Sequence, residues 1–160
     1  MLHLIVLRHA KSDWEAGATS DHERPLNARG RREAPIVGAR LVEQGFAPEW
    51  ISSSDSTRTR ETLAAMKLHL GAVETRFDRR LYLADLEAVR QLAEELPVDV
   101  RRWMIVGHNP GWEELVTTVT ARPTEMKTAY AAVLRGPAKS FVELLDGSRT
   151  LELHRLITPD

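Results

Sequence analysis

Continuous apolar runs mark the strands of this sequence. Residues 103–106 are wholly apolar, and residues 2–7 are apolar apart from His3. Such short runs are typical of strands buried on both faces of a parallel sheet. A third early strand is predicted at residues 50–53, and a short one within residues 77–83. Late strands are predicted at residues 129–134, 140–145 and 151–156, the last two on either side of a turn at Asp146 and Gly147.

Between these strands, apolar residues recur at the spacing of a helix. The first helix begins after Asn27, which suits the N-cap position, and ends at Gly45. Its apolar face is formed by Ala34, Val37, Leu41 and Val42. Pro97 ends another helix, because proline cannot continue the backbone hydrogen bonds. The polar segment 11–27 is predicted as a long loop, and the remaining helices as residues 58–69, 86–96 and 113–120.

Strands that alternate with helices predict one α/β domain over residues 1–160, with a mainly parallel central sheet flanked by helices. In such sheets, binding and catalytic sites lie beyond the carboxyl ends of the strands. Three polar clusters follow predicted strands directly: Arg8 with His9, residues 54–58, and Gly107 with His108. We therefore expect these clusters, which are far apart in the sequence, to meet at one edge of the sheet.

Composition narrows the class of protein. The 160 residues are 42% apolar and 28% charged, which are ordinary values for a globular domain. A formal net charge of -1 gives no general attraction to nucleic acid or to an anionic membrane. The chain has no cysteine, hence no disulfide and no thiol nucleophile, and no segment has the pattern of a secretory signal or a membrane span. We expect a protein of the reducing cytoplasm.

Arginine and histidine recur in the clusters that are expected to meet. Arginine binds phosphoryl oxygens bidentately and keeps its charge. A histidine with one free ring nitrogen can act as a covalent nucleophile, and a second histidine can stabilise charge in the transition state. Phosphoryl transfer without a metal ion needs these groups, and the clusters supply them as Arg8, His9, Arg58 and His108.

Four motifs, in order along the chain, resemble those of the histidine phosphatase superfamily, in the form of its SixA-type phosphohistidine phosphatases. The first is Arg8-His9-Ala10 after an apolar strand, with alanine where glycine is usual. The second, within residues 21–30, is similar to an acidic-x-x-Arg-Pro-Leu segment. The third and fourth resemble Ser-x-x-x-Arg-x-x-x-Thr and the second histidine motif, and lie at residues 54–62 and 106–110.

The resemblance implies a role for each matched residue. His9 would be phosphorylated transiently, Arg8 and Arg58 would hold the phosphoryl oxygens, and His108 would complete the pocket. Two further residues, Arg24 and Asn109, would bind the substrate. The resemblance implies no metal ion and no cofactor.

Two details of the third motif need an interpretation. Arg60 competes with Arg58 for the matched position, and Arg58 is favoured because it lies four residues before Thr62, as the motif requires. Asp55 stands where the family often has proline. Its charge would lie near the proposed anion site, or its side chain would cap the following helix, and the cap is the favoured interpretation.

The proton donor is not identified by any motif, so four carboxyl groups, or none, stay possible: Asp13, Asp21, Asp85 and Glu87. A phosphohistidine substrate would lessen this need, because its leaving imidazole requires less help than an alkoxide. Trp14 and Trp112 follow proposed catalytic motifs closely, and each either walls the pocket or packs in the core. The other histidines, interpreted as structural or exposed, are His3, His22, His69 and His154.

The sequence thus predicts a metal-independent phosphatase with a phosphohistidine intermediate on His9. Its substrate would be a phosphorylated protein, with phosphohistidine preferred, or an exposed phosphate on a small molecule. The alternatives are a phosphate-binding regulatory module without turnover and a small-molecule phosphatase. Neither nucleic acid nor a membrane is expected as a partner, and the sequence does not indicate the oligomeric state or any regulation.

Overall fold

The six strands form one mixed sheet in which β1 lies between a parallel and an antiparallel neighbour. The computed structural model describes residues 1–160, and the strand order is β3-β2-β4-β1-β5-β6. The first four of these run parallel, whereas β5 pairs antiparallel with both β1 and β6. The prediction of a mainly parallel sheet is confirmed. The strands are β1 (Leu2–Arg8), β2 (Trp50–Ser54), β3 (Glu74–Asp78), β4 (Arg102–Gly107), β5 (Ala131–Gly136) and β6 (Glu152–Ile157).

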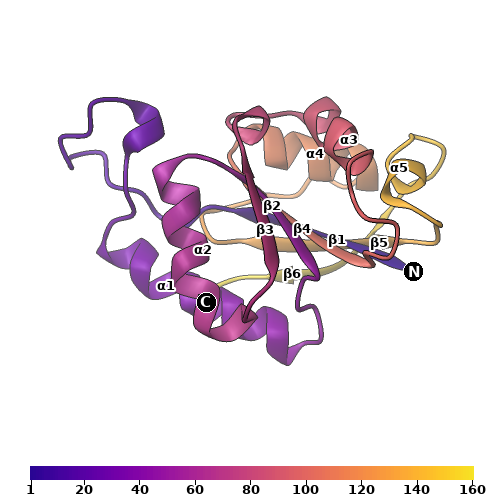
Figure 1. Cartoon of the computed structure of the whole chain (residues 1–160), viewed down its shortest axis with the longest axis horizontal. Coiled ribbons are helices and arrows are strands. Elements are labelled where there is room, and N and C mark those ends of the chain that lie inside the picture. Colours follow the sequence, from indigo (N-terminus) through magenta and orange to yellow (C-terminus); the bar gives the residue numbers. More distant parts are fainter.

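Helices cover both faces of this sheet (Figure 1). One face is covered by α1 (Ala28–Glu43) and α2 (Thr57–Leu70). The other face is covered by α3 (Leu86–Ala93), α4 (Gly111–Thr120) and the short α5 (Phe141–Leu144). Two 3-10 turns complete the fold, η1 (Asp21–Glu23) and η2 (Arg79–Leu81). None of the helices combines the length and the apolar character that crossing a membrane would require.

Each face of the sheet has its own apolar core, one of 21 buried residues beside α3, α4 and α5 and one of 17 beside α1 and α2. Side chains of β1 alternate between the two cores. Leu4 and Val6 belong to the first, and Ile5 and Leu7 to the second. Because both faces of β1 are buried, its sequence is an apolar run rather than an alternating pattern.

The beginnings of α1 and α2 are fixed by side-chain caps. Asn27 caps α1 through its side-chain oxygen, as predicted, and Ser56 caps α2 in the same way. The interpretation of Asp55 as the cap of α2 is therefore wrong. Its carboxylate instead accepts hydrogen bonds from His22 Nε2 at 2.7 Å and from Arg79 Nε at 3.0 Å, which join η1 and η2 to the end of β2.

The strand predicted at residues 140–145 is wrong, because α5 occupies this segment. Ser140 Oγ accepts a hydrogen bond from the N–H of Glu143 at 3.2 Å, and the carboxylate of Glu143 accepts one from the N–H of Lys139 at 3.0 Å. These local side-chain bonds stabilise a helical turn and outweigh the apolar pattern of the segment.

Two boundaries differ from the prediction for similar local reasons. The strand sought within residues 77–83 begins earlier, as β3 pairs in parallel with β2 from Glu74 to Asp78. The Asp78 carboxylate then accepts the N–H of Arg80 at 2.8 Å and starts η2. Helix α3 ends at Ala93, three residues before its predicted end, because the chain tightens into turns of the 3-10 type.

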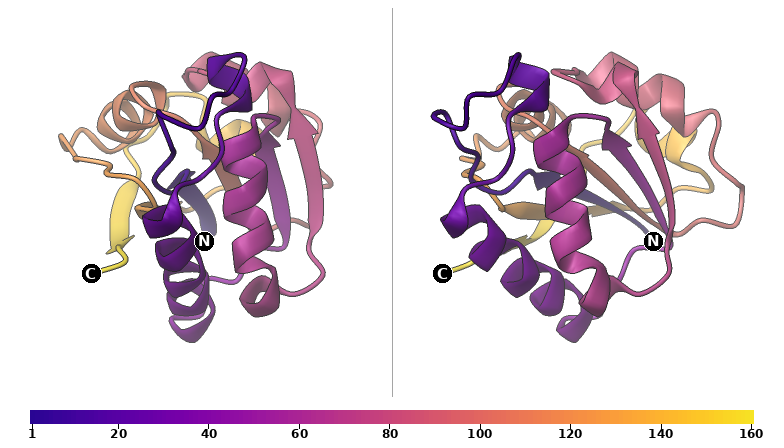
Figure 2. Two further views of the ribbon diagram at one scale, coloured as in Figure 1. Left: turned by 90° about the vertical axis from the view of Figure 1, so that its left-hand side faces the viewer. Right: turned by 60° about the vertical axis from the view of Figure 1, so that its left-hand side comes forward.

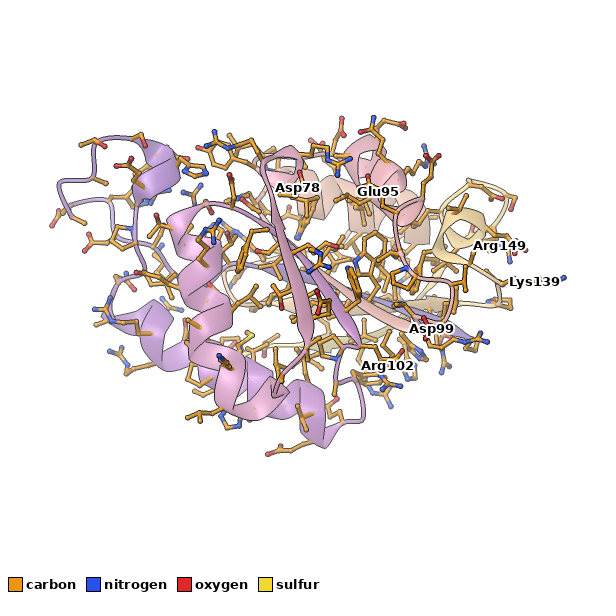
Figure 3. All side chains as sticks on the ribbon, viewed as in Figure 1. Asp78, Glu95, Asp99, Arg102, Lys139 and Arg149 are labelled. Carbon is orange, nitrogen blue, oxygen red and sulfur yellow. The ribbon has the colours of Figure 1, made fainter.

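The long segment 11–27 projects beyond the sheet beside the beginning of α2 (Figure 2). A bridge between Ser12 and Leu26 closes its base, and η1 contacts α2. In Figure 3, Asp78 marks the carboxyl end of β3 and Arg102 the amino end of β4, at opposite edges of the sheet. The projecting segment lies toward the carboxyl edge.

Candidate active site

The three polar clusters meet at the carboxyl edge of the sheet, as the strand pattern predicts. The rings of His9 and His108, which follow β1 and β4, lie 5.2 Å apart between centroids. Ser54, the last residue of β2, places its Oγ 2.9 Å from Nε2 of His108. Since β4 pairs with both β1 and β2, the parallel register carries all three strand ends to one place.

The tautomer of His9 is fixed by the backbone. Its Nδ1 lies 2.6 Å from the carbonyl oxygen of Ala10, and a carbonyl can only accept, so Nδ1 carries the proton. Burial, together with the charges of Arg58 and Arg8, lowers the pKa of His9 to about 3. The ring is therefore neutral near pH 7, and its Nε2 has a free lone pair. The N–H of Ala10 donates to Thr62 Oγ1 at 3.0 Å, which fastens this turn to α2.

His108 is buried with 2% of its surface exposed. Ser54 Oγ accepts a hydrogen bond from the N–H of Ser56 at 3.3 Å. Nε2 of His108 is the acceptor within reach of the Ser54 hydroxyl proton. With Ser54 Oγ as the donor to Nε2, the ring proton is on Nδ1, which is buried and has no partner within the protein. Burial and the charge of Arg58 lower the pKa of His108 to about 3. The edge of the Tyr82 ring packs against it at 5.3 Å.

Arg8 reaches across the site from the last position of β1. Its Nη1 donates to the carbonyl oxygen of Met126 at 3.0 Å, while its Nε is buried without a partner in the protein. Burial lowers the pKa of this guanidinium, and the negative charge of Glu113 opposes that shift. Because arginine stays protonated even so, the site keeps a fixed positive charge.

Arg58 is buried to 3% exposure at the start of α2. Its Nη1 donates to the carbonyl oxygen of Asp21 at 2.6 Å, and its Nη2 donates to the Asp21 carboxylate at 3.0 Å. Burial opposes ionisation of Asp21, yet hydrogen bonds from Tyr82, Arg58 and Arg24 outweigh it and hold the pKa of this carboxyl well below its usual range. The remaining donor of Arg58, Nε, is buried and has no partner in the protein.

Three buried nitrogens without a protein partner thus belong to the neighbours of His9: Nε of Arg8, Nε of Arg58 and Nδ1 of His108. Buried donors are costly unless an acceptor satisfies them. A phosphoryl group offers several anionic oxygens to such donors, and the lone pair of His9 is free to attack its phosphorus atom. The arrangement suits the binding and transfer of a phosphoryl group.

The other residues expected at the site have protein partners. Arg24 is 8% exposed and donates to Ser12 Oγ at 2.6 Å and to the Asp21 carboxylate at 3.1 Å. Its guanidinium also stacks over the ring of Trp14 at 3.5 Å. The side-chain amide of Asn109 donates to the Glu113 carboxylate and to the carbonyl oxygen of Met126, each at 2.8 Å.

Arg60 and the two tryptophans lie outside the three-donor cluster. Arg60 is exposed, donates to the carbonyl oxygen of Asp55 at 2.9 Å and stacks on Phe77. Trp112 is fully buried, and its Nε1 donates to the carbonyl oxygen of Leu7 at 3.0 Å, so it packs in the core. Trp14 is 74% exposed on the projecting segment.

The four carboxyl groups considered as proton donors are engaged in different ways. Asp21 is ionised beside Arg58. Asp85 caps α3, Asp13 accepts the N–H of Glu15 at 2.8 Å, and Glu87 lies 3.8 Å from a guanidinium nitrogen of Arg90. Each of the four thus has a partner of its own, and none of them forms a hydrogen bond to Nε of Arg8, Nε of Arg58 or Nδ1 of His108.

Two neighbours of the site are not predicted by the sequence. The Tyr82 hydroxyl donates to Asp21, and His22, expected to be structural or exposed, packs edge-on against Tyr82 at 4.9 Å and pairs with Asp55. The signal for His22 was its place inside the second motif. Tyr82 lies in the connection between η2 and α3, where no periodic pattern indicates its direction.

Comparison with known proteins agrees with the fold and with the phosphoryl-binding character of the site. A sequence model described as histidine phosphatase superfamily (branch 1) matches residues 4–134. An uncharacterised chloroplast protein of Arabidopsis thaliana is 36% identical over 171 residues, covering 98% of this chain and 78% of that protein. The crystal structure of the putative phosphohistidine phosphatase SixA from Agrobacterium tumefaciens superposes with a TM-score of 0.81 at 26% identity, covering 99% of each chain. A second SixA structure, in complex with tungstate, has the same fold with a TM-score of 0.80 at 20% identity, covering 99% of this chain and 97% of that one.

Proposed function

Because this chain belongs to the histidine phosphatase superfamily, we propose that it is a phosphatase that works without a metal ion and uses His9 as its nucleophile. The observation that carries the proposal is the set of three buried, unpartnered donors around a neutral histidine whose Nε2 is free. A similar SixA protein has been solved with tungstate, an oxyanion.

The proposed reaction has two steps. In the first, Nε2 of His9 forms a bond to phosphorus while the bond from phosphorus to the leaving group breaks, and the leaving group departs with the bonding electron pair. Nε of Arg8, Nε of Arg58 and Nδ1 of His108 donate to the phosphoryl oxygens throughout. In the second step, water attacks phosphorus, the nitrogen–phosphorus bond breaks, and inorganic phosphate leaves.

The proposed substrate is phosphohistidine on a protein, or an exposed phosphate on a small molecule. The state of Asp21 supports a leaving group that needs little protonation, since this carboxyl group is ionised and holds Arg58. Departing imidazole meets that condition better than an alkoxide. The likeness to a putative phosphohistidine phosphatase supports the same substrate class. The lack of cysteine supports action in the cytoplasm.

Arg24 is proposed to contribute positive charge at the substrate side of Arg58, since both guanidinium groups bind the carboxylate of Asp21. The second candidate function is a regulatory module that binds phosphate without turnover. It is favoured by a single observation, namely that each of the four carboxyl groups considered as proton donors is engaged with another partner.

A rapid-quench experiment tests the proposal. The protein is mixed with a phosphohistidine-bearing carrier protein or with an aryl phosphate, quenched in alkali and analysed by mass spectrometry. We expect a transient adduct of about 80 Da on His9, as covalent catalysis requires. His9→Ala should form no adduct and release no phosphate, whereas His69→Ala, at an exposed helix position, should behave as the wild type. Tight phosphate binding with neither adduct nor release would favour the regulatory module.

A further inference from the structure

Met126 is held by its backbone rather than by regular secondary structure. It lies in residues 121–130, which contain no helix or strand. Its carbonyl oxygen accepts Nη1 of Arg8 at 3.0 Å and Nδ2 of Asn109 at 2.8 Å. Its N–H donates to Oε2 of Glu113 at 3.1 Å. Both backbone groups of one loop residue are therefore bound by side chains from the beginning of α4 and the turn before it.

Asn109 and Glu113 also bind each other, at 2.8 Å between Nδ2 and Oε2. The two side chains and Met126 form a closed set of three hydrogen bonds, so that moving one partner breaks at least two. Glu113 also supplies the negative charge that opposes the effect of burial on Arg8. Arg8 is thus supported by an acceptor whose own position is fixed.

The orientation of the Asn109 amide follows from its neighbours. Both groups within hydrogen-bond distance of Nδ2, the Glu113 carboxylate and the Met126 carbonyl, can only accept. The amide nitrogen must therefore face them, which leaves Oδ1 as the free atom, buried and without a partner. An amide oxygen is an acceptor and does not bind a phosphoryl oxygen. In this orientation Asn109 has no free donor for the substrate.

We propose that Asn109 and Glu113 are positioning residues, which fix the guanidinium of Arg8 toward the phosphoryl group by clamping the Met126 carbonyl. The inference rests on the proposed function and replaces the direct contact between Asn109 and substrate that the sequence suggests. Arg8 is held on its Nη1 side, and this directs Nε, its free buried donor, to the site.

The test measures phosphate binding and catalysis separately. Calorimetry gives the Kd of inorganic phosphate, and steady-state assays with an aryl phosphate give kcat and KM. Asn109→Ala and Glu113→Ala should each weaken phosphate binding and lower kcat/KM about tenfold, since each removes support for a charged hydrogen bond. Glu113→Gln keeps the shape and one acceptor and should lose less. Glu114→Gln, at the exposed neighbouring position of α4, should change nothing.

A double-mutant cycle with Arg8→Ala gives the readout that a merely structural role would not move. If the two residues act through Arg8, Asn109→Ala and Glu113→Gln should have no further effect on phosphate binding once Arg8 is alanine. Losses that add in full would overturn the inference, as would unchanged binding in both single variants. Unchanged phosphate binding in Arg8→Ala alone would contradict the proposed function instead. Circular dichroism and thermal melting verify that each variant is folded. If an alanine variant does not fold, Glu113→Gln is used in its place.

Discussion

Asp21 holds Arg58 at two points, with its carbonyl oxygen 2.6 Å from Nη1 and its carboxylate 3.0 Å from Nη2. A carboxylate bound in this way keeps its negative charge, which agrees with the depressed pKa of Asp21. This carboxylate therefore orients a positive group of the site. The projecting segment 11–27 therefore contributes to the site through Asp21, which binds Arg58.

Asp21→Asn should lower kcat/KM about tenfold by weakening the hold on Arg58. The loss should be equal for an aryl phosphate and an alkyl phosphate, because Asp21 orients Arg58 and does not protonate the leaving group. Steady-state assays with both substrates measure this. A loss far larger for the alkyl phosphate, whose leaving group needs a proton, would identify Asp21 as the general acid.

Arg58→Ala and Arg60→Ala should differ greatly in effect. Arg58 is buried at the site, and losing a preorganised charge partner of the transition state costs about 3 kcal/mol or more, or over a hundredfold in kcat/KM. Arg60 is exposed and stacks on Phe77, so its loss should be within about twofold. Steady-state assays of the two purified variants measure these losses. A larger loss in Arg60→Ala than in Arg58→Ala would show that Arg60 occupies the motif position.

Ser54→Ala should remove the group that fixes the proton of His108 on Nδ1. We expect kcat to fall about tenfold while the fold is kept. Nitrogen-15 spectra of the imidazole should show a mixture of tautomers in place of one. Ser53→Ala is the matched control, since Ser53 is equally buried on the same strand but its Oγ donates to the carbonyl oxygen of Ser54. Identical tautomers in Ser54→Ala and the wild type would exclude this role.

Stability should fall as the pH decreases from about 6.5 toward 3. Burial lowers the pKa of His9 and of His108 to about 3, whereas a histidine in the unfolded chain has a pKa of about 6.5. In this window the unfolded state binds more protons, so the free energy of unfolding rises with pH, by up to about 1.4 kcal/mol per pH unit for each histidine.

Urea denaturation between pH 4 and pH 7 measures this slope. His9→Gln should reduce it, because the substituted side chain takes up no proton on unfolding. His69→Gln, at an exposed position, should leave it unchanged. A wild-type slope no steeper than that of His9→Gln would mean that His9 is already protonated in the folded protein.

The core of the site could be predicted because it follows buried strands. Arg8 and His108 stand directly after apolar runs, and the parallel order of β1, β4 and β2 brings such positions together. The support for these residues could not be predicted in the same way. Tyr82 and Met126 lie in irregular segments, and their directions depend on contacts between parts of the chain that no local pattern links.

The same limit applies to the fold. Asn27 could be identified as a cap because its chemistry and its place before an apolar periodicity agree. Asp55 has the chemistry of a cap as well, yet the next residue, Ser56, fills that position. The Asp55 carboxylate instead binds His22 and Arg79, which come from distant parts of the chain. The helix-cap propensity of a single residue does not contain such long-range contacts.

The place of β1 in the sheet has a consequence during synthesis. This strand is synthesised well before its two neighbours in the sheet, β4 at Arg102–Gly107 and β5 at Ala131–Gly136. At common translation speeds of 5–20 residues per second, an apolar strand waits roughly ten seconds for both partners. During that interval the apolar strand lacks its sheet partners, a state that favours aggregation, and for most of it His108 has not yet been synthesised. The proposed active site can therefore form only near the end of the synthesis of these 160 residues.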